Sequence, residues 1–141
     1  MATENTSETG ARFYDAWNTG NVDLLDQVCA PDVLYHLPPM PDADLAGLKQ
    51  MILATLMSDP DFKVWEDEQT TEGATTCSRW TCSSTFTGVN PLLPGVEPTG
   101  KQQTTSGATI THWKDGKAVE IWHFGDMLGM LQQQGVLPPL G

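Results

Sequence analysis

Basic residues are scarce in this sequence, which has seven Lys or Arg against 18 Asp or Glu and a formal net charge of −11. Binding to the phosphate backbone of a nucleic acid requires basic side chains that displace counterions. Anionic membrane surfaces likewise attract clusters of basic residues. We therefore expect neither a nucleic-acid partner nor a membrane partner for this chain.

Cysteine is also scarce, and the three residues Cys29, Cys77 and Cys82 contain no CxxC pair. Cys77 and Cys82 are five residues apart, so on one strand they would point to opposite faces and could not form a disulfide. No apolar run is long enough to cross a bilayer. The polar start, MATENTSETG, lacks the basic and apolar segments of a signal peptide. These absences predict reduced thiols and a cytoplasmic location.

The length of 141 residues suits one domain with a single core. Apolar residues at helical spacing predict helices over 11–19, 22–28, 45–56 and 127–134. Alternating apolar residues and high Thr and aromatic content predict strands over 33–37, 62–71, 75–87, 104–113 and 117–124. Asp115-Gly116 predicts a tight hairpin turn. We expect a flexible tail over 1–10 and one α+β domain over 11–141, with a largely antiparallel sheet wrapped around the helices.

One carboxylate, Asp126, lies where the last predicted strand ends and the last predicted helix begins. If the hairpin turn has two residues and alternation is regular, His112 faces Val119, and Asp126 shares a face with Trp122 and Phe124. An aromatic surface with one carboxylate is typical of a small-molecule pocket, in which the carboxylate can act as a general base. Asp at such a junction is also a preferred helix N-cap. The two roles can coexist.

Six stretches follow one another along nearly the whole chain: DVLYHLPP (32–39), SDPDFKV (58–64), SRWTCSSTFTG (78–88), PTGKQ (98–102), WKDGKAVEIW (113–122) and DMLGMLQQQG (126–135). In this order they resemble the SnoaL-like polyketide cyclases of the nuclear-transport-factor-2-like superfamily. The resemblance implies a cone-shaped, cystatin-like α+β barrel. Its curved antiparallel sheet would wrap around N-terminal helices and enclose a deep apolar cavity, and a short helix would end the chain.

The resemblance implies that Asp126 is the general acid/base of an intramolecular aldol ring closure in a polyketide ester. Such an enzyme requires neither a metal nor an organic cofactor, because the extended aromatic substrate stabilises its own enolate. His36 falls at a histidine often seen at the end of the first strand, where it would bond either a substrate oxygen or a backbone carbonyl. His112 matches a histidine of some cyclases, but it would reach the site only if a bulge shifted the register.

An aromatic, polyketide-like substrate would contact five side chains: Trp122, Phe86, Trp80, Tyr14 and Phe124. Phe86 stands in STFTG, where the family often has the histidine of GTHTG. Ordinary core packing is the alternative for the aromatic residues. The histidines lack metal-ligand spacing, so no metal site is expected. The loop 88–100, with three Pro and three Gly, would act as a lid or a dimer contact.

The first hypothesis is thus a cofactor-independent cyclase that binds a hydrophobic small molecule. By resemblance alone, a homodimer or homotetramer is expected. Fold does not determine function, and two alternatives stay open: another small-molecule enzyme, such as an isomerase, dehydratase or hydrolase, or a non-catalytic module for ligand binding or assembly.

Overall fold

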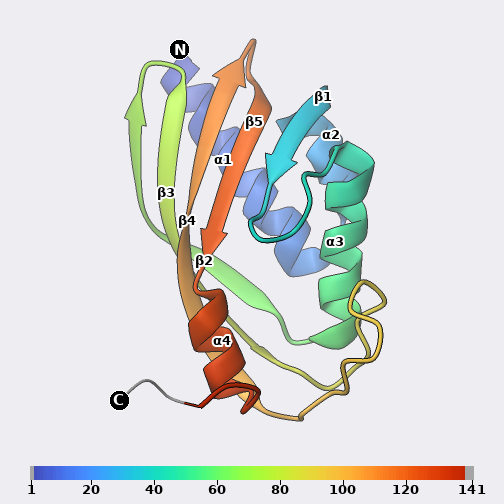
Figure 1. The fold of residues 1–141 in the computed structure, drawn as a ribbon. Helices are drawn as coiled ribbons and strands as arrows, with labels where there is room; N and C mark the ends of the chain where they lie inside the picture. The colour runs from blue at the N-terminus through green and yellow to red at the C-terminus, as the bar shows by residue number, and fades with distance from the viewer. Residues whose placement is uncertain (1, 139–141) are drawn as a thin grey trace.

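The computed structural model describes residues 2–138 and contains an α+β fold (Figure 1). In chain order its elements are α1 (Ala2–Thr19), η1 (Val22–Leu24), α2 (Leu25–Val28), β1 (Cys29–His36), α3 (Leu45–Ser58), β2 (Lys63–Glu72), β3 (Thr75–Thr85), β4 (Gln102–Lys114), β5 (Lys117–Gly125) and α4 (Met127–Gln133). Most of the expected tail, 1–10, falls on the first half of α1. No described helix is both long and apolar enough to cross a bilayer.

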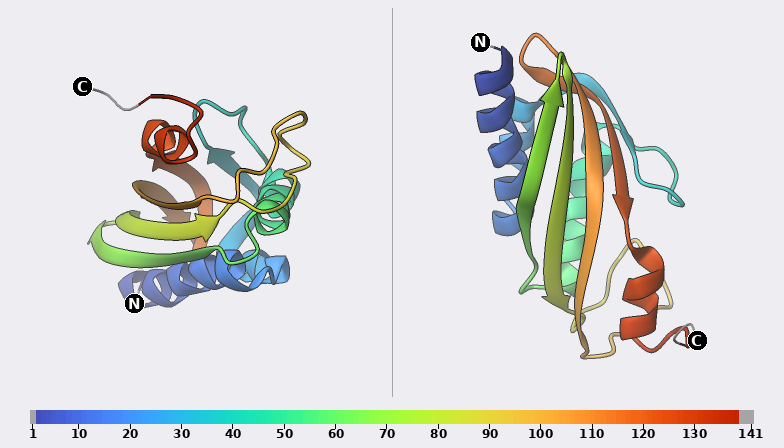
Figure 2. Two further views of the ribbon diagram at one scale, coloured as in Figure 1. Left: turned by 90° about the horizontal axis from the view of Figure 1, so that it is seen from below. Right: turned by 90° about the vertical axis from the view of Figure 1, so that its left-hand side faces the viewer.

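The five strands form one curved, mixed sheet in the order β1-β5-β4-β3-β2 (Figure 2). Strands β2 to β5 form the expected antiparallel meander. Strand β1 adds to β5 in parallel, which the connections along the sequence did not indicate. The sheet is not closed into a barrel, since β1 and β2 remain its two edges. The predicted α+β class with a curved sheet and a short C-terminal helix is confirmed.

Two aspartates cap helices in the same way. Oδ1 of Asp44 accepts a hydrogen bond from the Gly47 N–H at 2.8 Å at the start of α3. Oδ1 of Asp126 accepts one from the Gly129 N–H at 2.8 Å at the start of α4. Each satisfies a backbone donor that the first turn of a helix leaves free. Both predicted caps are confirmed.

The hydrophobic core lies between one face of the sheet and the three helices α1, α2 and α3. Figure 2 shows α1 crossing this face of the sheet. The largest fully buried side chains come from both layers: Tyr35, Leu25, Leu48, Ile52, Ile121, Val28, Val33 and Cys29. The loop 88–100 and α4 lie together at one end of the molecule (Figure 1). The three helices therefore pack on one part of the curved sheet to form the core, and the loop 88–100 and α4 lie at the other end of the sheet.

A bulge in the β4–β5 hairpin decides which side chains face the helices. The turn is as predicted, with positive φ at Asp115 and Gly116. Trp113 then pairs with Ala118, but the next pair is His112 with Glu120. One residue of β5 is therefore extra, and every later side chain of that strand is turned to the opposite face.

The predicted face of β5 is wrong beyond this bulge. Ile121 is buried in the core and pairs with Thr111, and His123 pairs with Thr109. Trp122 and Phe124 consequently lie on the outer face of the sheet, and Phe124 is 47% exposed. The expectation that Asp126 shares a face with these two aromatic residues fails for the same reason.

Candidate functional site

A cavity of about 310 Å³ lies between the sheet, α1, α3, α4 and the loop 88–100. Most of its lining is apolar. Aromatic and methionine side chains supply much of the wall: Phe13, Trp17, Phe62, Trp80, Phe86, Met40, Met51, Met127 and Met130. Flat aromatic rings and adaptable thioethers are suited to a planar apolar ligand. A small number of polar groups interrupt this wall.

Asp126 is one of these polar groups, and it lines the cavity from an exposed position at the start of α4. It reaches the cavity because strand alternation ends at Gly125, while its own N–H still donates to the Ser106 carbonyl at 3.0 Å. Oδ1 caps the helix, and no described group bonds Oδ2. Asp126 therefore caps α4 and borders the cavity at once.

Gly129 makes room for this carboxylate. A Cβ atom added at Gly129 would lie 2.2 Å from Oδ2 of Asp126 and 2.7 Å from its Cγ. Both distances are far inside van der Waals contact, so any other residue would push the carboxylate aside. The position three residues after Asp126 therefore requires glycine, because a larger residue would collide with the carboxylate of the site.

His123 presents a neutral imidazole to the cavity. Its Nδ1 lies 2.7 Å from the Tyr35 hydroxyl oxygen, and its ring centroid lies 4.8 Å from that of Trp80. Burial lowers the pKa of His123 to about 4, because the apolar surroundings penalise the charged form. Burial also raises the pKa of Tyr35 well above its ordinary value. Both groups are therefore uncharged at neutral pH.

A second carboxylate, Asp59, also lines the cavity and is only 7% exposed. Ser58 Oγ donates to one of its oxygens and Ser84 Oγ to the other, each at 2.6 Å. Gln103 Nε2 donates to Ser84 Oγ at 3.3 Å, and Gln134 Nε2 donates to Gln103 Oε1 at 2.8 Å. This chain of hydrogen bonds joins α3, β3, β4 and the end of α4, so it braces the wall of the cavity.

The structure brings four of the predicted site residues to the cavity: Asp126, Phe86, Trp80 and Tyr14. Trp80 is held in place by its Nε1–H, which donates to Thr109 Oγ1 at 2.9 Å. Phe86 is fixed through its backbone, since its N–H donates to the Lys101 carbonyl at 3.1 Å. The phenyl ring of Phe86 makes this part of the wall apolar.

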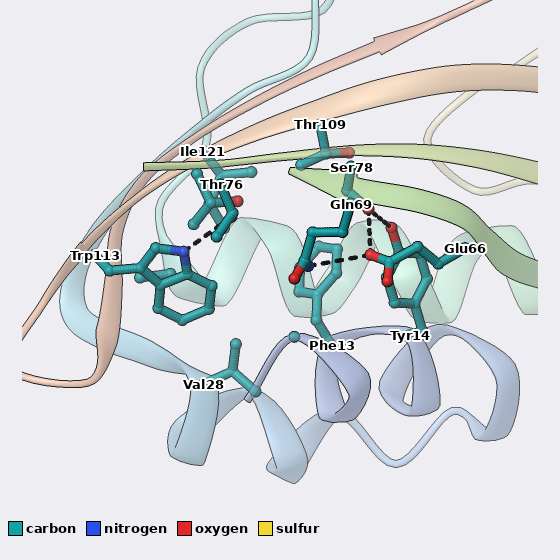
Figure 3. Close-up of a pocket in the computed structure, with 13 residues that line it drawn as sticks. Phe13, Tyr14, Val28, Glu66, Gln69, Thr76, Ser78, Thr109, Trp113 and Ile121 are labelled. Carbon is teal, nitrogen blue, oxygen red and sulfur yellow. Dashed lines mark hydrogen bonds between the residues drawn. The ribbon is translucent and has the colours of Figure 1, made fainter. Parts of the chain in front are cut away.

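The hydroxyl of Tyr14 points to a separate, smaller pocket between α1 and the sheet (Figure 3). This pocket has a volume of about 30 Å³. The hydroxyl bonds Ser78 Oγ, which donates to a Glu66 carboxylate oxygen. Burial raises the pKa of Tyr14 to about 12. Tyr14 therefore offers its ring to the main cavity, while its hydroxyl is engaged elsewhere.

The remaining predicted residues, His36, His112, Trp122 and Phe124, are not part of the cavity lining. His36 Nε2 bonds Glu120 at 2.7 Å and Nδ1 bonds Asp42 at 2.8 Å, and these bonds raise the pKa of His36. The His36 ring stacks on Trp122, and His112 contacts the edge of Trp122. These four residues lie outside the cavity because the pairing of β1, β4 and β5 turns their side chains to the outer face of the sheet.

Three polar groups of the cavity, His123, Asp59 and Gln134, were not predicted. His123 needed the bulge to turn inward, and nothing in the hairpin sequence marks the extra residue. Asp59 lies in SDPDF, where an acidic residue after a helix indicates a turn. A buried neighbour such as Ser84, 25 residues away, leaves no local signal.

Residues 8–134 match the sequence profile of the SnoaL-like polyketide cyclase family. None of the curated proteins matches the chain. Among solved structures, IdmH of Streptomyces antibioticus, a candidate polyketide cyclase, is 27% identical with a TM-score of 0.77, and the alignment covers 92% of this chain and 98% of IdmH.

Two further solved structures are similar in fold. TsrD of Streptomyces laurentii has a TM-score of 0.84 at 22% identity, over 95% of this chain and 97% of TsrD. AclR of Streptomyces galilaeus, a candidate hydroxylase, has a TM-score of 0.83 at 22% identity, over 100% of this chain and 87% of AclR. At these identities the likeness concerns the fold and not the reaction.

Proposed function

Since the chain belongs to the SnoaL-like polyketide cyclase family, we propose that it closes a ring in an aromatic polyketide ester by an intramolecular aldol reaction. The observation that carries this proposal is the position of Asp126, a carboxylate at the border of a cavity lined mainly by aromatic and methionine side chains. The apolar wall binds the planar substrate, and the carboxylate supplies the acid/base chemistry.

Asp126 acts twice in the proposed reaction. Its carboxylate removes the proton from the carbon between two carbonyl groups, and the resulting enolate carbon attacks a third carbonyl carbon to form the new C–C bond. The protonated Asp126 then returns the proton to the alkoxide, which becomes a hydroxyl. No atom is gained or lost, so product and substrate are isomers.

The hydrogen bond from the Gly129 N–H supports this role, because it holds the carboxylate in one orientation at the cavity border. The phenyl ring of Phe86, at a position where the resemblance implies a histidine, makes its part of the cavity wall apolar. The proposed substrate therefore presents hydrocarbon to Phe86.

The experiment that tests the reaction is incubation of the protein with an uncyclised aromatic β-keto ester, followed by chromatography and mass spectrometry. The proposal expects a new product of unchanged mass that contains an additional ring. A product lighter by one water would identify a dehydratase, and a product heavier by one water a hydrolase. An unchanged substrate, with the protein folded, would contradict any enzymatic role for this substrate class.

A second candidate is a ligand-binding module without catalysis. Asp126 is exposed and one of its oxygens already caps α4, which is what a purely structural aspartate would also show. In that case the same β-keto ester would quench tryptophan fluorescence on binding yet would be recovered unchanged.

The proposed partner is therefore a hydrophobic, polyketide-like small molecule. A homodimer or homotetramer and a cytoplasmic location remain part of the proposal. Light scattering of the purified protein would test the first, and fractionation of cells that express the chain would test the second.

A further inference from the structure

The hydrogen bond between Tyr35 and His123 fixes which imidazole nitrogen carries a proton. Tyr35 is fully buried, and His123 Nδ1, at 2.7 Å, is the partner of its hydroxyl. A buried phenol must donate its proton, and no other described acceptor bonds this hydroxyl. Tyr35 is therefore the donor and Nδ1 the acceptor, which places the imidazole proton on Nε2.

The Nε2–H group is a free donor at the cavity. His123 lines the cavity, and among the described residues only its Nδ1 has a hydrogen-bond partner. Burial keeps the ring neutral, with the pKa lowered to about 4. A neutral imidazole with a fixed tautomer is a known means of polarising a carbonyl group.

A second donor lies beside it. Trp17 also lines the cavity, and its ring centroid is 6.3 Å from that of His123. Trp17 is 7% exposed, and its Nε1 is the buried side-chain nitrogen that lacks a partner in the described part of the chain. An unpaired buried N–H is costly, and each such group requires an explanation. Because this Nε1–H is closed to solvent in the present conformation, a ligand oxygen bound by His123 would accept from it after a small rotation of the indole.

We propose that His123 and Trp17 form a subsite that binds a carbonyl oxygen of the ligand, with Tyr35 as the residue that positions the imidazole. His123 and Asp126 are three positions apart in the chain, so their Cα atoms are at most about 11 Å apart. A ligand carbonyl held by His123 therefore lies within reach of the carboxylate across a single planar substrate.

The subsite has a direct role in the proposed cyclisation, and in this respect it rests on the proposed function. Removal of a proton by Asp126 moves negative charge onto a carbonyl oxygen. Two N–H donors that bond that oxygen stabilise the enolate more than the neutral ketone. Because both donors are neutral and the surrounding wall is apolar, a ligand carboxylate would lose its hydration without gaining a counter-charge, so the subsite selects ketones and esters.

The test uses two inert ligands with one ring skeleton, 9-fluorenone and fluorene, which differ in a single carbonyl group. Neither can cyclise, so the result does not depend on catalysis. Dissociation constants are measured by tryptophan fluorescence for the wild type and for His123→Phe. We expect the ratio of the fluorene to the fluorenone constant to fall roughly tenfold in the variant, because the hydrogen bonds to the carbonyl are lost.

A second readout reports the hydrogen bond itself. The carbonyl of ¹³C-labelled 9-fluorenone should resonate downfield when bound to the wild type, and less so when bound to Trp17→Phe or His123→Phe. Trp65→Phe is the matched control, since Trp65 is exposed and outside the cavity lining. Tyr35→Phe should reduce the downfield shift and alter the ¹⁵N shifts of His123, which a merely structural role for Tyr35 would leave unchanged.

His123→Phe leaves the buried Tyr35 hydroxyl without a partner, so Tyr35→Phe/His123→Phe provides a variant without an orphaned group. Equal ligand ratios in the wild type and this double variant, or no binding of either ligand to the wild type, would overturn the subsite. A retained fluorenone preference in a protein that fails to cyclise the β-keto ester would keep the subsite and reject the cyclase. Cyclisation without a fluorenone preference would do the reverse.

Discussion

Tyr35 and His123 lie on the two parallel strands β1 and β5, and a hydrogen bond of 2.7 Å joins the phenol of one to the imidazole of the other. Tyr35 belongs to the hydrophobic core, whereas His123 also borders the cavity. The bond therefore connects the buried core of the fold to the wall that a ligand would touch. Changes on either side of this bond should be measurable in both stability and binding.

The first prediction concerns stability at acid pH. His123 titrates near 6.5 in an unfolded chain, whereas its pKa in the fold is about 4. Between these values the unfolded state binds more protons, so folding is destabilised as the pH falls. The total loss is on the order of 3 kcal/mol. Denaturant unfolding at pH 7 and at pH 4 measures it.

The double variant Tyr35→Phe/His123→Phe is the reference for this measurement, because it lacks the buried imidazole. His36 acts in the opposite sense, since its pKa is raised and its stabilisation is lost as the pH rises. It is present in both proteins and cancels in the difference. A pH dependence that is the same in wild type and double variant would show that His123 is not a buried neutral group.

The second prediction concerns Gly129. Gly129→Ala should unfold at about the same free energy as the wild type, because the roughly 0.5–1 kcal/mol by which Ala is favoured over Gly inside a helix offsets the weakened Asp126 cap, which is worth about 1 kcal/mol. Its turnover should nevertheless fall, because the new methyl group would lie 2.2 Å from Oδ2 of Asp126 and displace the carboxylate. Turnover of the β-keto ester and denaturant unfolding measure the two effects separately.

Gly47→Ala is the matched control, since Gly47 occupies the same position after Asp44 and its added Cβ would lie 3.3 Å from the Asp44 carboxylate. Neither residue lines the cavity. Equal turnover in Gly129→Ala and Gly47→Ala would argue against a required orientation of Asp126.

The third prediction concerns the packing of Trp80 against β4. A Cβ added at Gly107 would lie 2.5 Å from Trp80 Cζ2 and 2.3 Å from the Phe124 carbonyl oxygen. Gly107→Ala should therefore destabilise the fold by about 1–3 kcal/mol and weaken fluorenone binding. At Gly125 the nearest Trp80 atom would be 3.5 Å away, an ordinary contact. Gly125→Ala should consequently be the more stable of the two, and the reverse order would contradict this packing.

Local signals in the sequence were sufficient for most of the fold. The two Asp caps, the Asp115-Gly116 turn and the alternation of the strands depend on residues a few positions apart, and the structure has each of them. Ordered resemblance along the chain supplied the curved sheet and the cavity. These features need no knowledge of distant contacts.

The composition of the site was less predictable, because it depends on one extra residue in β5. Regular alternation placed Trp122 and Phe124 with Asp126, whereas the bulge after Ala118 turns His123 inward instead. His36 illustrates the same limit, since its strand β1 pairs in parallel with β5 and presents it to Glu120 on the outer face. Whether a side chain faces inward is a property of pairing between strands, which periodicity within one strand does not contain.

The most direct test of the account is the turnover of the β-keto ester by Asp126→Asn compared with Asp44→Asn. Asn caps a helix about as well as Asp, so both variants should unfold at the same denaturant concentration as the wild type. A positioned general base contributes roughly 10²–10⁴-fold to rate. The account predicts a loss of turnover of at least about 100-fold in Asp126→Asn and none in Asp44→Asn. Wild-type turnover in a folded Asp126→Asn protein would contradict it.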